Sequence, residues 1–139
     1  MRLLVRREHG AHELAGKLQQ KGFMAAEIEE AITECQRLGL QSDGRFVENL
    51  CRARIRQGYG PIRICQELQT KQVDRSLIEH QLRQEHDNWL GYAIDVWTKK
   101  YKEQSELSYA GLQKQKQFLL YRGFSTETIA MVFTELRKD

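Results

Sequence analysis

Few side chains in this sequence are spaced as catalytic or metal-binding residues are. His9 and His12 are the only close histidine pair, three residues apart, with no nearby cysteine or evident third ligand. The turn Gly58-Tyr59-Gly60-Pro61 lacks the lysine and the preceding strand of a phosphate-binding loop, so we interpret it as a turn between helices. Because catalysis needs a nucleophile with a base, paired acids, a metal or a phosphate cradle, we expect no enzyme, no bound metal and no cofactor.

The cysteines and the N-terminal residues indicate the cellular compartment of the protein rather than a chemical activity. Cys35, Cys51 and Cys65 have no C-x-x-C spacing and lie among apolar residues on expected helices, which is typical of reduced, packed thiols. The apolar run at residues 3–5 is far too short for a signal-peptide core or a membrane span. We therefore expect a cytoplasmic protein.

Charge is unevenly distributed along the chain, although the net charge is only +3. Arginines and lysines cluster in the middle and later parts, and glutamates cluster early. Such patches suit an acidic polymer or a charged protein partner, and solvated helix faces are the alternative interpretation. The clusters are Arg52, Arg54, Arg56 and Arg63, then Lys99, Lys100 and Lys102, and the acidic group Glu27, Glu29, Glu30 and Glu34.

The elements that would position these charges come from a threefold repeat. Segments beginning at Leu14, Ile64 and Gln115 match at offsets of 50 and 51 residues in apolar spacing, turn position and basic residues. This period predicts an all-α fold of three tandem three-helix repeats that form an elongated, curved helical array. We place the repeats at residues 1–40, with a short or truncated opening helix, at 41–86 and at 87–139. The matched sets are Leu18, Leu68 and Leu119; Phe23, Val73 and Phe124; Ile28, Ile78 and Ile129; and Ile32, Leu82 and Phe133.

Capping and turn residues predict where the helices begin and end. Asp43 and Asp74 are expected to cap helices in the second repeat, and Ser125 is expected to cap the last helix of the third. A polar loop is expected over residues 103–108. The predicted helices are 43–57, 61–71, 74–86, 88–102, one that ends before Gly123, and 126–138, with Trp89, Ala93 and Trp97 as an apolar core stripe.

Helical wheels separate basic from apolar faces. On the helix from Asp43, Arg45, Asn49, Arg52 and Arg56 lie opposite the apolar arc. Arg54 falls within that apolar arc, and we interpret it as structural. In the third repeat Lys114, Phe118 and Tyr121 share a face that could stack on bases, anchor a protein interface or contact another repeat.

Two segments resemble a known family. The stretch Asp43-Gly44-Arg45-Phe46, followed by residues 54–64 with the sequence RIRQGYGPIRI, resembles the central motif of the bacterial RecX family. Residues 114–124 resemble the C-terminal repeat of that family, and the resemblance covers essentially the whole chain. It implies three tandem three-helix repeats and a regulator that binds the RecA recombinase on DNA, lodges in the groove of its filament and restrains filament growth, ATP hydrolysis, strand exchange and coprotease activity.

The family pattern defines no sharp functional residues, so the candidates come from the basic faces. We expect a monomer that binds the RecA filament and contacts DNA weakly. A free-standing DNA-binding protein and an adaptor between other proteins stay open as alternatives, although a net charge of +3 argues against tight DNA binding. The candidate partner- or DNA-binding residues are Arg45, Arg52, Arg56 and Arg63 in the second repeat, and Lys99, Lys100, Lys102, Lys114, Tyr121 and Arg122 in the third.

Overall fold

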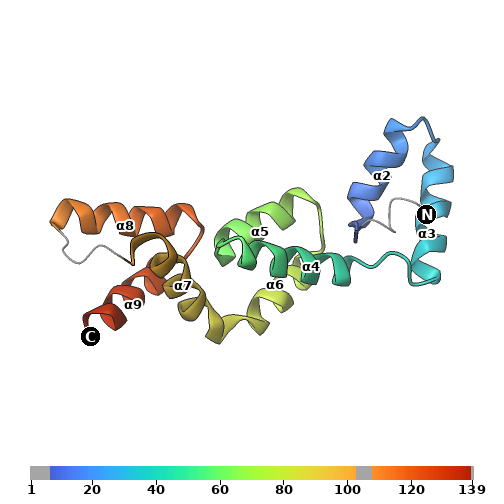
Figure 1. Cartoon of the computed structure of the whole chain (residues 1–139). Coiled ribbons are helices and arrows are strands. Elements are labelled where there is room, and N and C mark those ends of the chain that lie inside the picture. Colours follow the sequence, from blue (N-terminus) through green and yellow to red (C-terminus); the bar gives the residue numbers. More distant parts are fainter. Residues whose placement is uncertain (1–6, 103–107, 139) are drawn as a thin grey trace. The chain divides into compact units, whose positions relative to one another are not determined.

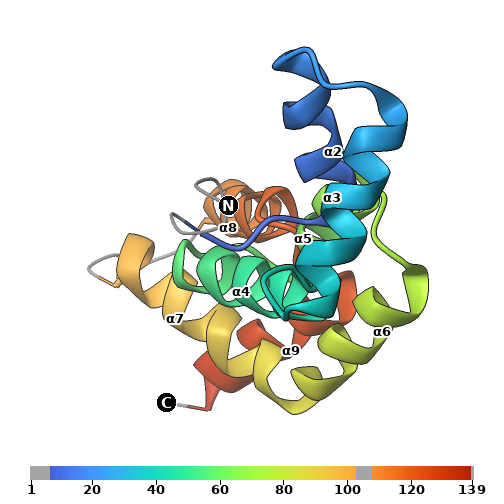
Figure 2. The same cartoon turned by 90° about the vertical axis from the view of Figure 1, so that its right-hand side faces the viewer.

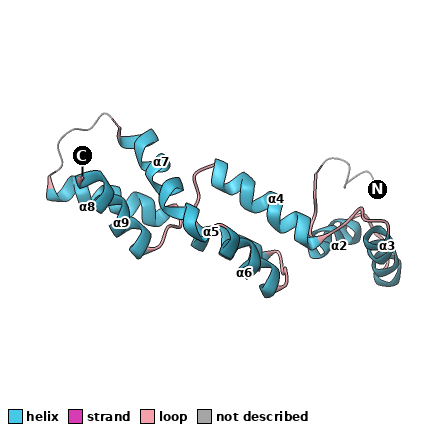
Figure 3. Cartoon of the chain, turned by 90° about the horizontal axis from the view of Figure 1, so that it is seen from below, coloured by secondary structure: helices cyan, strands magenta, loops and turns pink. Residues whose placement is uncertain are grey.

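Every regular element in the part of the chain that the structure describes is a helix (Figure 3). The computed structural model describes residues 7–102 and 108–138, so the run at residues 3–5 and the expected loop at 103–107 lie outside it. The predicted all-α class is confirmed, and no helix in the described ranges is long and apolar enough to cross a membrane. The elements are α2 (Ala11–Gln20), α3 (Ala25–Arg37), α4 (Asp43–Arg56), α5 (Pro61–Thr70), α6 (Arg75–Gln84), the short 3₁₀ helix η1 (His86–Asn88), α7 (Trp89–Tyr101), α8 (Tyr109–Tyr121) and α9 (Thr126–Arg137).

Two of the predicted helix caps are confirmed. At the start of α6, Asp74 Oδ1 accepts a hydrogen bond from the Ser76 backbone N–H at 3.0 Å. At the start of α9, Ser125 Oγ accepts one from the Thr128 N–H at 3.1 Å. Each side chain satisfies a backbone donor that has no partner within its helix.

The predicted capping role of Asp43 is wrong. Asp43 is the first residue of α4, and Ser42 Oγ accepts from the Arg45 N–H at 3.3 Å instead. Asp43 Oδ1 accepts from the Ala11 N–H at 2.8 Å and so caps α2, a helix 32 residues earlier in the chain. Gly10 precedes α2 and has no side chain to cap it, which leaves this donor for Asp43.

The turns that separate the last two helices of each repeat share a backbone conformation. Gly22 and Gly123 have positive φ angles of 94° and 97°, and Gln72 occupies the matching position with a φ of 53°. Glycine adopts this left-handed region without a Cβ clash, whereas glutamine there costs on the order of 1 kcal/mol. The sequence repeat is therefore also a repeat of backbone geometry.

The chain divides into two compact units, each of which is described separately. The first comprises residues 1–51 and 67–81, and the second comprises residues 52–66 and 82–139. In the first unit α2 packs side by side with α3 (Figures 1 and 2). Leu14, Leu18 and Ile28 form the buried cluster between these two helices.

In the second unit α7 packs against both α8 and α9 (Figure 1). Trp89 and Ala93 are buried, which confirms their predicted place in the core. Trp97 is half-buried, and its Nε1–H donates to Oε1 of the buried Gln115 at 2.7 Å. The polar atom of the indole is thus paired inside an otherwise apolar interface.

The three cysteines are free thiols. Cys35 and Cys51 are buried, and Cys65 is partly buried. This agrees with their interpretation as packed, reduced residues.

Within the first unit a charged cluster joins the segment before α2, α2 itself and the turn that follows α5. Arg7 donates to Glu13 through two hydrogen bonds, of 3.0 and 2.7 Å, and Lys71 Nζ lies 3.6 Å from Glu13 Oε2. Burial raises the pKa of Glu13, but the hydrogen bond from Arg7 and the positive charges of Arg7 and Lys71 outweigh it, so the pKa lies below its ordinary value. The carboxylate is therefore held in its charged form.

His9 is buried beside this cluster. Its Nδ1 lies 3.1 Å from the Arg7 carbonyl oxygen, and its Nε2 lies 2.9 Å from Lys17 Nζ. Because a carbonyl only accepts and an ammonium only donates, the neutral ring protonated at Nδ1 satisfies both contacts. Burial is the largest cause of the lowered pKa of His9; the charges of Arg7 and Lys17 add to it, and the hydrogen bond to the Arg7 carbonyl opposes it.

The lowered pKa of His9 makes stability depend on pH. His9 titrates near its ordinary pKa of 6.5 in the unfolded chain, so below that pH the unfolded chain binds a proton that the folded chain refuses. We expect the free energy of unfolding to be retained above about pH 6.5 and to fall as the pH drops from there through the folded-state pKa. Urea unfolding followed by circular dichroism over about pH 5–8 measures this slope.

The matched control is His12, which is exposed on α2, three residues after His9. We expect His9→Gln to make the free energy of unfolding depend less steeply on pH. His12→Gln should preserve the contribution of His9 to that pH dependence. Identical slopes in the wild-type protein and His9→Gln would contradict the assignment.

Candidate functional site: a basic groove in the second unit

The site is built on contact between two turns, one from α4 to α5 and one from α8 to α9. The Gly60 N–H donates to the Arg122 carbonyl at 2.7 Å, and the Ile62 N–H donates to the Gly123 carbonyl at 2.9 Å. A Cβ on Gly60 would lie 2.6 Å from the Gly123 carbonyl carbon, and one on Gly123 would lie 2.5 Å from the Arg63 Cβ. The two backbones approach this closely only because both positions are glycine.

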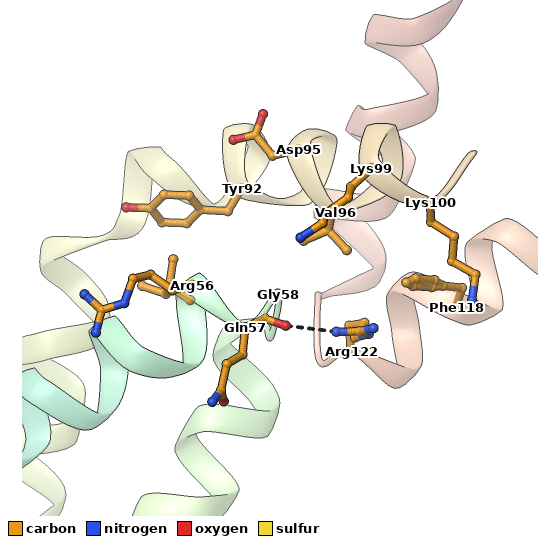
Figure 4. A pocket seen from close by; sticks show the side chains of 11 residues that line it. Arg56, Gln57, Gly58, Tyr92, Asp95, Val96, Lys99, Lys100, Phe118 and Arg122 are labelled. Atoms are coloured by element: carbon orange, nitrogen blue, oxygen red, sulfur yellow. Dashed lines mark hydrogen bonds between the residues drawn. The ribbon is translucent and has the colours of Figure 1, made fainter. Parts of the chain in front are cut away.

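The side chain of Arg122 strengthens the same contact. Its Nη1–H donates to the Gln57 carbonyl at 3.0 Å, as the dashed line in Figure 4 marks. Its guanidinium carbon lies 5.3 Å from the centre of the Tyr59 ring and 5.0 Å from that of Phe118. Arg63 lies over the same Tyr59 ring at 4.2 Å. Cation–π contacts of this kind stabilise by about 0.5–1 kcal/mol at exposed sites.

A groove of about 540 Å³ lies beside these turns, between the end of α4, one face of α7 and the end of α8 (Figure 4). Its apolar and aromatic lining residues include Ile55, Tyr92, Val96 and Phe118. The charged residues in its lining are four cations and one carboxylate, namely Arg56, Lys99, Lys100, Arg122 and Asp95. In Figure 4 the Asp95 carboxylate points away from the hydrogen bond between Gln57 and Arg122.

Helix geometry explains why the lysines are placed here. Lys99 and Lys100 lie in the last turn of α7, where the negative end of the helix dipole favours cations. Lys100 extends toward Phe118, and its Nζ lies 4.4 Å from the centre of that ring (Figure 4). Positive charge beside a half-buried aromatic ring suits phosphate or carboxylate groups of a macromolecular partner.

The structure brings together only some of the predicted binding residues. Arg56, Lys99, Lys100 and Arg122 line the groove. Arg63 is engaged at the turn contact, where its Nη1 also lies 3.4 Å from the Tyr121 carbonyl oxygen. The remaining members of the second unit are exposed but do not line the groove; they are Arg52, Lys102, Lys114 and Tyr121, the last 73% exposed.

Arg45 lies in the first unit and is bound within it. Its Nε–H donates to Glu8 Oε1 at 2.8 Å, and its Nη2–H donates to the Gly39 carbonyl at 2.7 Å. Arg54, interpreted as structural, is half-buried and donates to the Gln57 side chain at 3.1 Å. The binding roles assigned to the basic residues stay predictions.

Sequence reasoning missed several groove residues. Tyr92, Asp95 and Val96 were not among the candidates, although together with the predicted Lys99 they lie at helical spacing along α7 and form one face of that helix. This helical spacing is the sequence pattern from which these groove residues could have been predicted. Tyr59, assigned only to a turn, was missed as the ring beneath two guanidinium groups.

Comparison with known proteins matches the whole chain to one family. The descriptions of the first, second and third three-helix domains of RecX match residues 1–35, 42–82 and 91–133. These matches confirm the predicted set of three tandem three-helix repeats, and the limits set at 1–40, 41–86 and 87–139 stay a prediction.

Individual relatives cover nearly all of the chain. The regulatory protein RecX of Legionella pneumophila (strain Corby) is 55% identical over 139 residues, which are 100% of this chain and 93% of the relative. That of Pseudomonas entomophila (strain L48) is 39% identical over 134 residues, 96% of this chain and 86% of the relative. The crystal structure of RecX from Lactobacillus salivarius is similar with a TM-score of 0.87 at 26% identity, over 99% of this chain and 92% of that one.

The close contact between the two turns predicts that one methyl group added at Gly60 strongly lowers stability. Gly60→Ala places a Cβ against the Gly123 backbone and separates the two hydrogen-bonded turns. We expect the free energy of unfolding of the second unit to fall by about 2 kcal/mol or more. Tryptophan fluorescence during urea unfolding reports on this unit, because Trp89 and Trp97 both belong to it.

Gly91 supplies the matched control. It is exposed on α7, and an added Cβ there meets no atom within 4 Å. Gly91→Ala should stabilise by about 0.5–1 kcal/mol, since alanine favours a helix interior. Equal stability of the two variants would show that the turns do not depend on Gly60.

Proposed function

The chain belongs to the RecX family, and we propose that it regulates the RecA recombinase by binding it, chiefly as a filament on DNA. Its action would be to inhibit or modulate filament extension, ATP hydrolysis, strand exchange and coprotease activity, and so to affect recombination, DNA repair and the SOS response. The observation that carries the proposal is the 55% identity, over the full chain, to a protein named regulatory protein RecX. Relatives named as regulatory proteins also favour a regulator over an enzyme.

The basic groove supports this proposal because a nucleoprotein filament presents phosphates and carboxylates together. Arg56, Lys99 and Lys100 line it with no ion-pair partner among the described residues. Arg122 differs, because its guanidinium is hydrogen-bonded to Gln57. Contacts of this kind are individually weak, and several of them on one chain add through effective concentration.

DNA-dependent ATP hydrolysis by RecA tests the function directly. Substoichiometric amounts of the chain should suppress the steady-state rate, and more strongly when the chain is added before the filament has grown. An unchanged rate at every ratio of chain to RecA would overturn the proposed function.

Charge reversal in the groove tests the site. In the double variant Arg56→Glu with Lys99→Glu, two attractive contacts become repulsive, and we expect the concentration for half-maximal inhibition to rise about tenfold. Arg122 is left unchanged because its loss would also break the turn contact.

Arg137→Glu with Lys138→Glu is the control variant, since it changes the net charge equally at the end of α9 and outside the groove lining. Circular dichroism confirms that each variant is folded. Equal loss of inhibition in both variants would indicate a nonspecific effect of charge and exclude the groove.

Free-standing DNA binding is the second candidate function, favoured by the cations that lie beside the Phe118 ring. It requires tight binding of DNA without RecA, with the logarithm of the affinity falling steeply against the logarithm of salt concentration. Titration of labelled single-stranded and duplex DNA at several salt concentrations separates the two functions. Weak binding with a shallow salt dependence would leave DNA contact as an accessory to RecA binding.

A further inference from the structure

The lining of the basic groove contains aliphatic as well as charged side chains. Ile55 near the end of α4 and Val96 in the middle of α7 are both half-buried. A Cβ built on Gly58 would lie 3.4 Å from Val96 Cγ2, so the two walls of the groove are close together at this point. Covering such aliphatic groups removes apolar surface from water, which stabilises a complex. An occupant with an apolar side chain therefore gains more here than one that is polar throughout.

The Phe118 ring in the lining is already engaged by its own unit. The Lys100 Nζ lies 4.4 Å from the centre of the ring, and the Arg122 guanidinium carbon lies 5.0 Å from it (Figure 4). The Tyr101 ring packs against Phe118 edge-on, with the two ring centres 5.6 Å apart. A nucleic-acid base that stacked on Phe118 would compete with these three contacts, so the ring is poorly suited to be a stacking platform.

The second aromatic ring, that of Tyr92, is held beside carboxylates. Its hydroxyl donates to Glu85 Oε2 at 2.6 Å, and its ring packs edge-on against Trp89 at 5.6 Å between centres. Asp95, which is exposed, lines the groove one turn further along α7. A nucleic-acid strand carries a phosphate on every nucleotide, so a strand along this wall of the groove would meet these carboxylates. A peptide can place an uncharged residue there.

The positive charge of the groove begins within one turn of Asp95. Lys99 lies four residues beyond it, which is about 6 Å along the helix axis. Arg56, Lys99 and Lys100 are exposed and have no ion-pair partner among the described residues. Charge of both signs over so short a distance suits an occupant whose own charges are spaced unevenly, as those of a peptide are.

We propose that the basic groove binds an acidic peptide segment of a partner protein, which inserts one large apolar side chain between flanking carboxylates. The inference rests on the proposed function for the role of the groove and names the chemical group that the groove recognises. The apolar side chain lies against Ile55 and Val96. The carboxylates of the segment pair with the three exposed cations, and an uncharged residue of the segment passes Asp95.

Three short fluorescein-labelled peptides of equal length test the proposal with the full chain. The first has adjacent leucines flanked by glutamates, the second has serines in place of the leucines, and the third has lysines in place of the glutamates. Fluorescence anisotropy should show that the first binds at least about tenfold more tightly than either of the others, with its advantage over the lysine peptide shrinking as salt is added. Equal binding of the first and second peptides, or of the first and third, would overturn the proposal.

A labelled oligothymidylate of equal length tests the nucleic-acid alternative. We expect it to bind at least about tenfold more weakly than the acidic leucine peptide at the same salt concentration. Asp95→Asn should strengthen the oligothymidylate about threefold and the peptide by less, because only the nucleic acid must place a charge beside that residue. An oligothymidylate that binds as tightly as the peptide would overturn the proposal, and an equal gain for both probes would contradict the role of Asp95.

Substitutions in the chain locate the binding. Arg56→Glu with Lys99→Glu should weaken the acidic leucine peptide about tenfold. Val96→Thr keeps the shape of the side chain but adds a hydroxyl, and it should weaken the leucine peptide about fivefold while leaving the serine peptide unchanged. The control variant is Arg137→Glu with Lys138→Glu, outside the groove lining. Equal loss in the control, or unchanged binding of the leucine peptide by both groove variants, would contradict the site.

Two further results separate this inference from its alternatives. If light scattering shows a dimer that the Arg56 and Lys99 variant dissociates, the occupant is a second copy of the chain and the proposal is overturned. The peptide assay contains neither RecA nor DNA, so it is independent of the ATPase assay. Suppressed ATP hydrolysis without peptide binding would overturn this inference alone, whereas peptide binding with unchanged hydrolysis would overturn the proposed function alone.

Discussion

The arrangement of the second unit depends on the direct contact of two backbones at Gly60 and Gly123. No side chain larger than hydrogen fits at either position, since a Cβ would lie within 2.6 Å of the opposite segment. This close approach allows two backbone hydrogen bonds, from the Gly60 N–H to the Arg122 carbonyl and from the Ile62 N–H to the Gly123 carbonyl. Because α4 ends and α5 begins at one turn, and α8 ends and α9 begins at the other, this single contact fixes four helix ends. The G-Y-G-P sequence is thus explained by packing before any partner is considered.

The same contact determines which cations can serve a partner. The Arg122 guanidinium donates a hydrogen bond to the Gln57 carbonyl and contacts two aromatic rings. Moving it toward a partner would therefore break the contact between the two turns. Arg45 likewise donates hydrogen bonds within the fold, to the Glu8 carboxylate and the Gly39 carbonyl. A basic residue can therefore be accessible to solvent and still be needed by the fold. Arg56, Lys99 and Lys100 carry the charge of the groove without such hydrogen bonds among the described contacts, which makes them better suited to recognition.

Much of the fold could be predicted from the sequence, because its determinants are local and occur three times. Asp74 and Ser125 cap the helices that follow them directly, and Trp89 and Ala93 lie at helical spacing. Asp43 was mispredicted because its partner, the Ala11 N–H, is 32 residues away. The site was less predictable for the same reason. A helical wheel places Arg45 and Arg56 on one face, but it cannot show that Glu8 binds Arg45 or that Arg56 lines a groove together with Lys99.

The departures from the repeat carry more functional information than the repeat itself. In the third copy α7 packs against α8 and α9, and its last turn places Lys99 and Lys100 in the lining of the basic groove. In the first copy Phe23 is 47% exposed, whereas Val73 and Phe124 at the matching places are 8% and 0% exposed. The basic groove can attract anionic groups through charge, whereas an exposed aromatic side chain such as Phe23 gains more from burying apolar surface. The same helical framework therefore presents different side chains to solvent in its different copies.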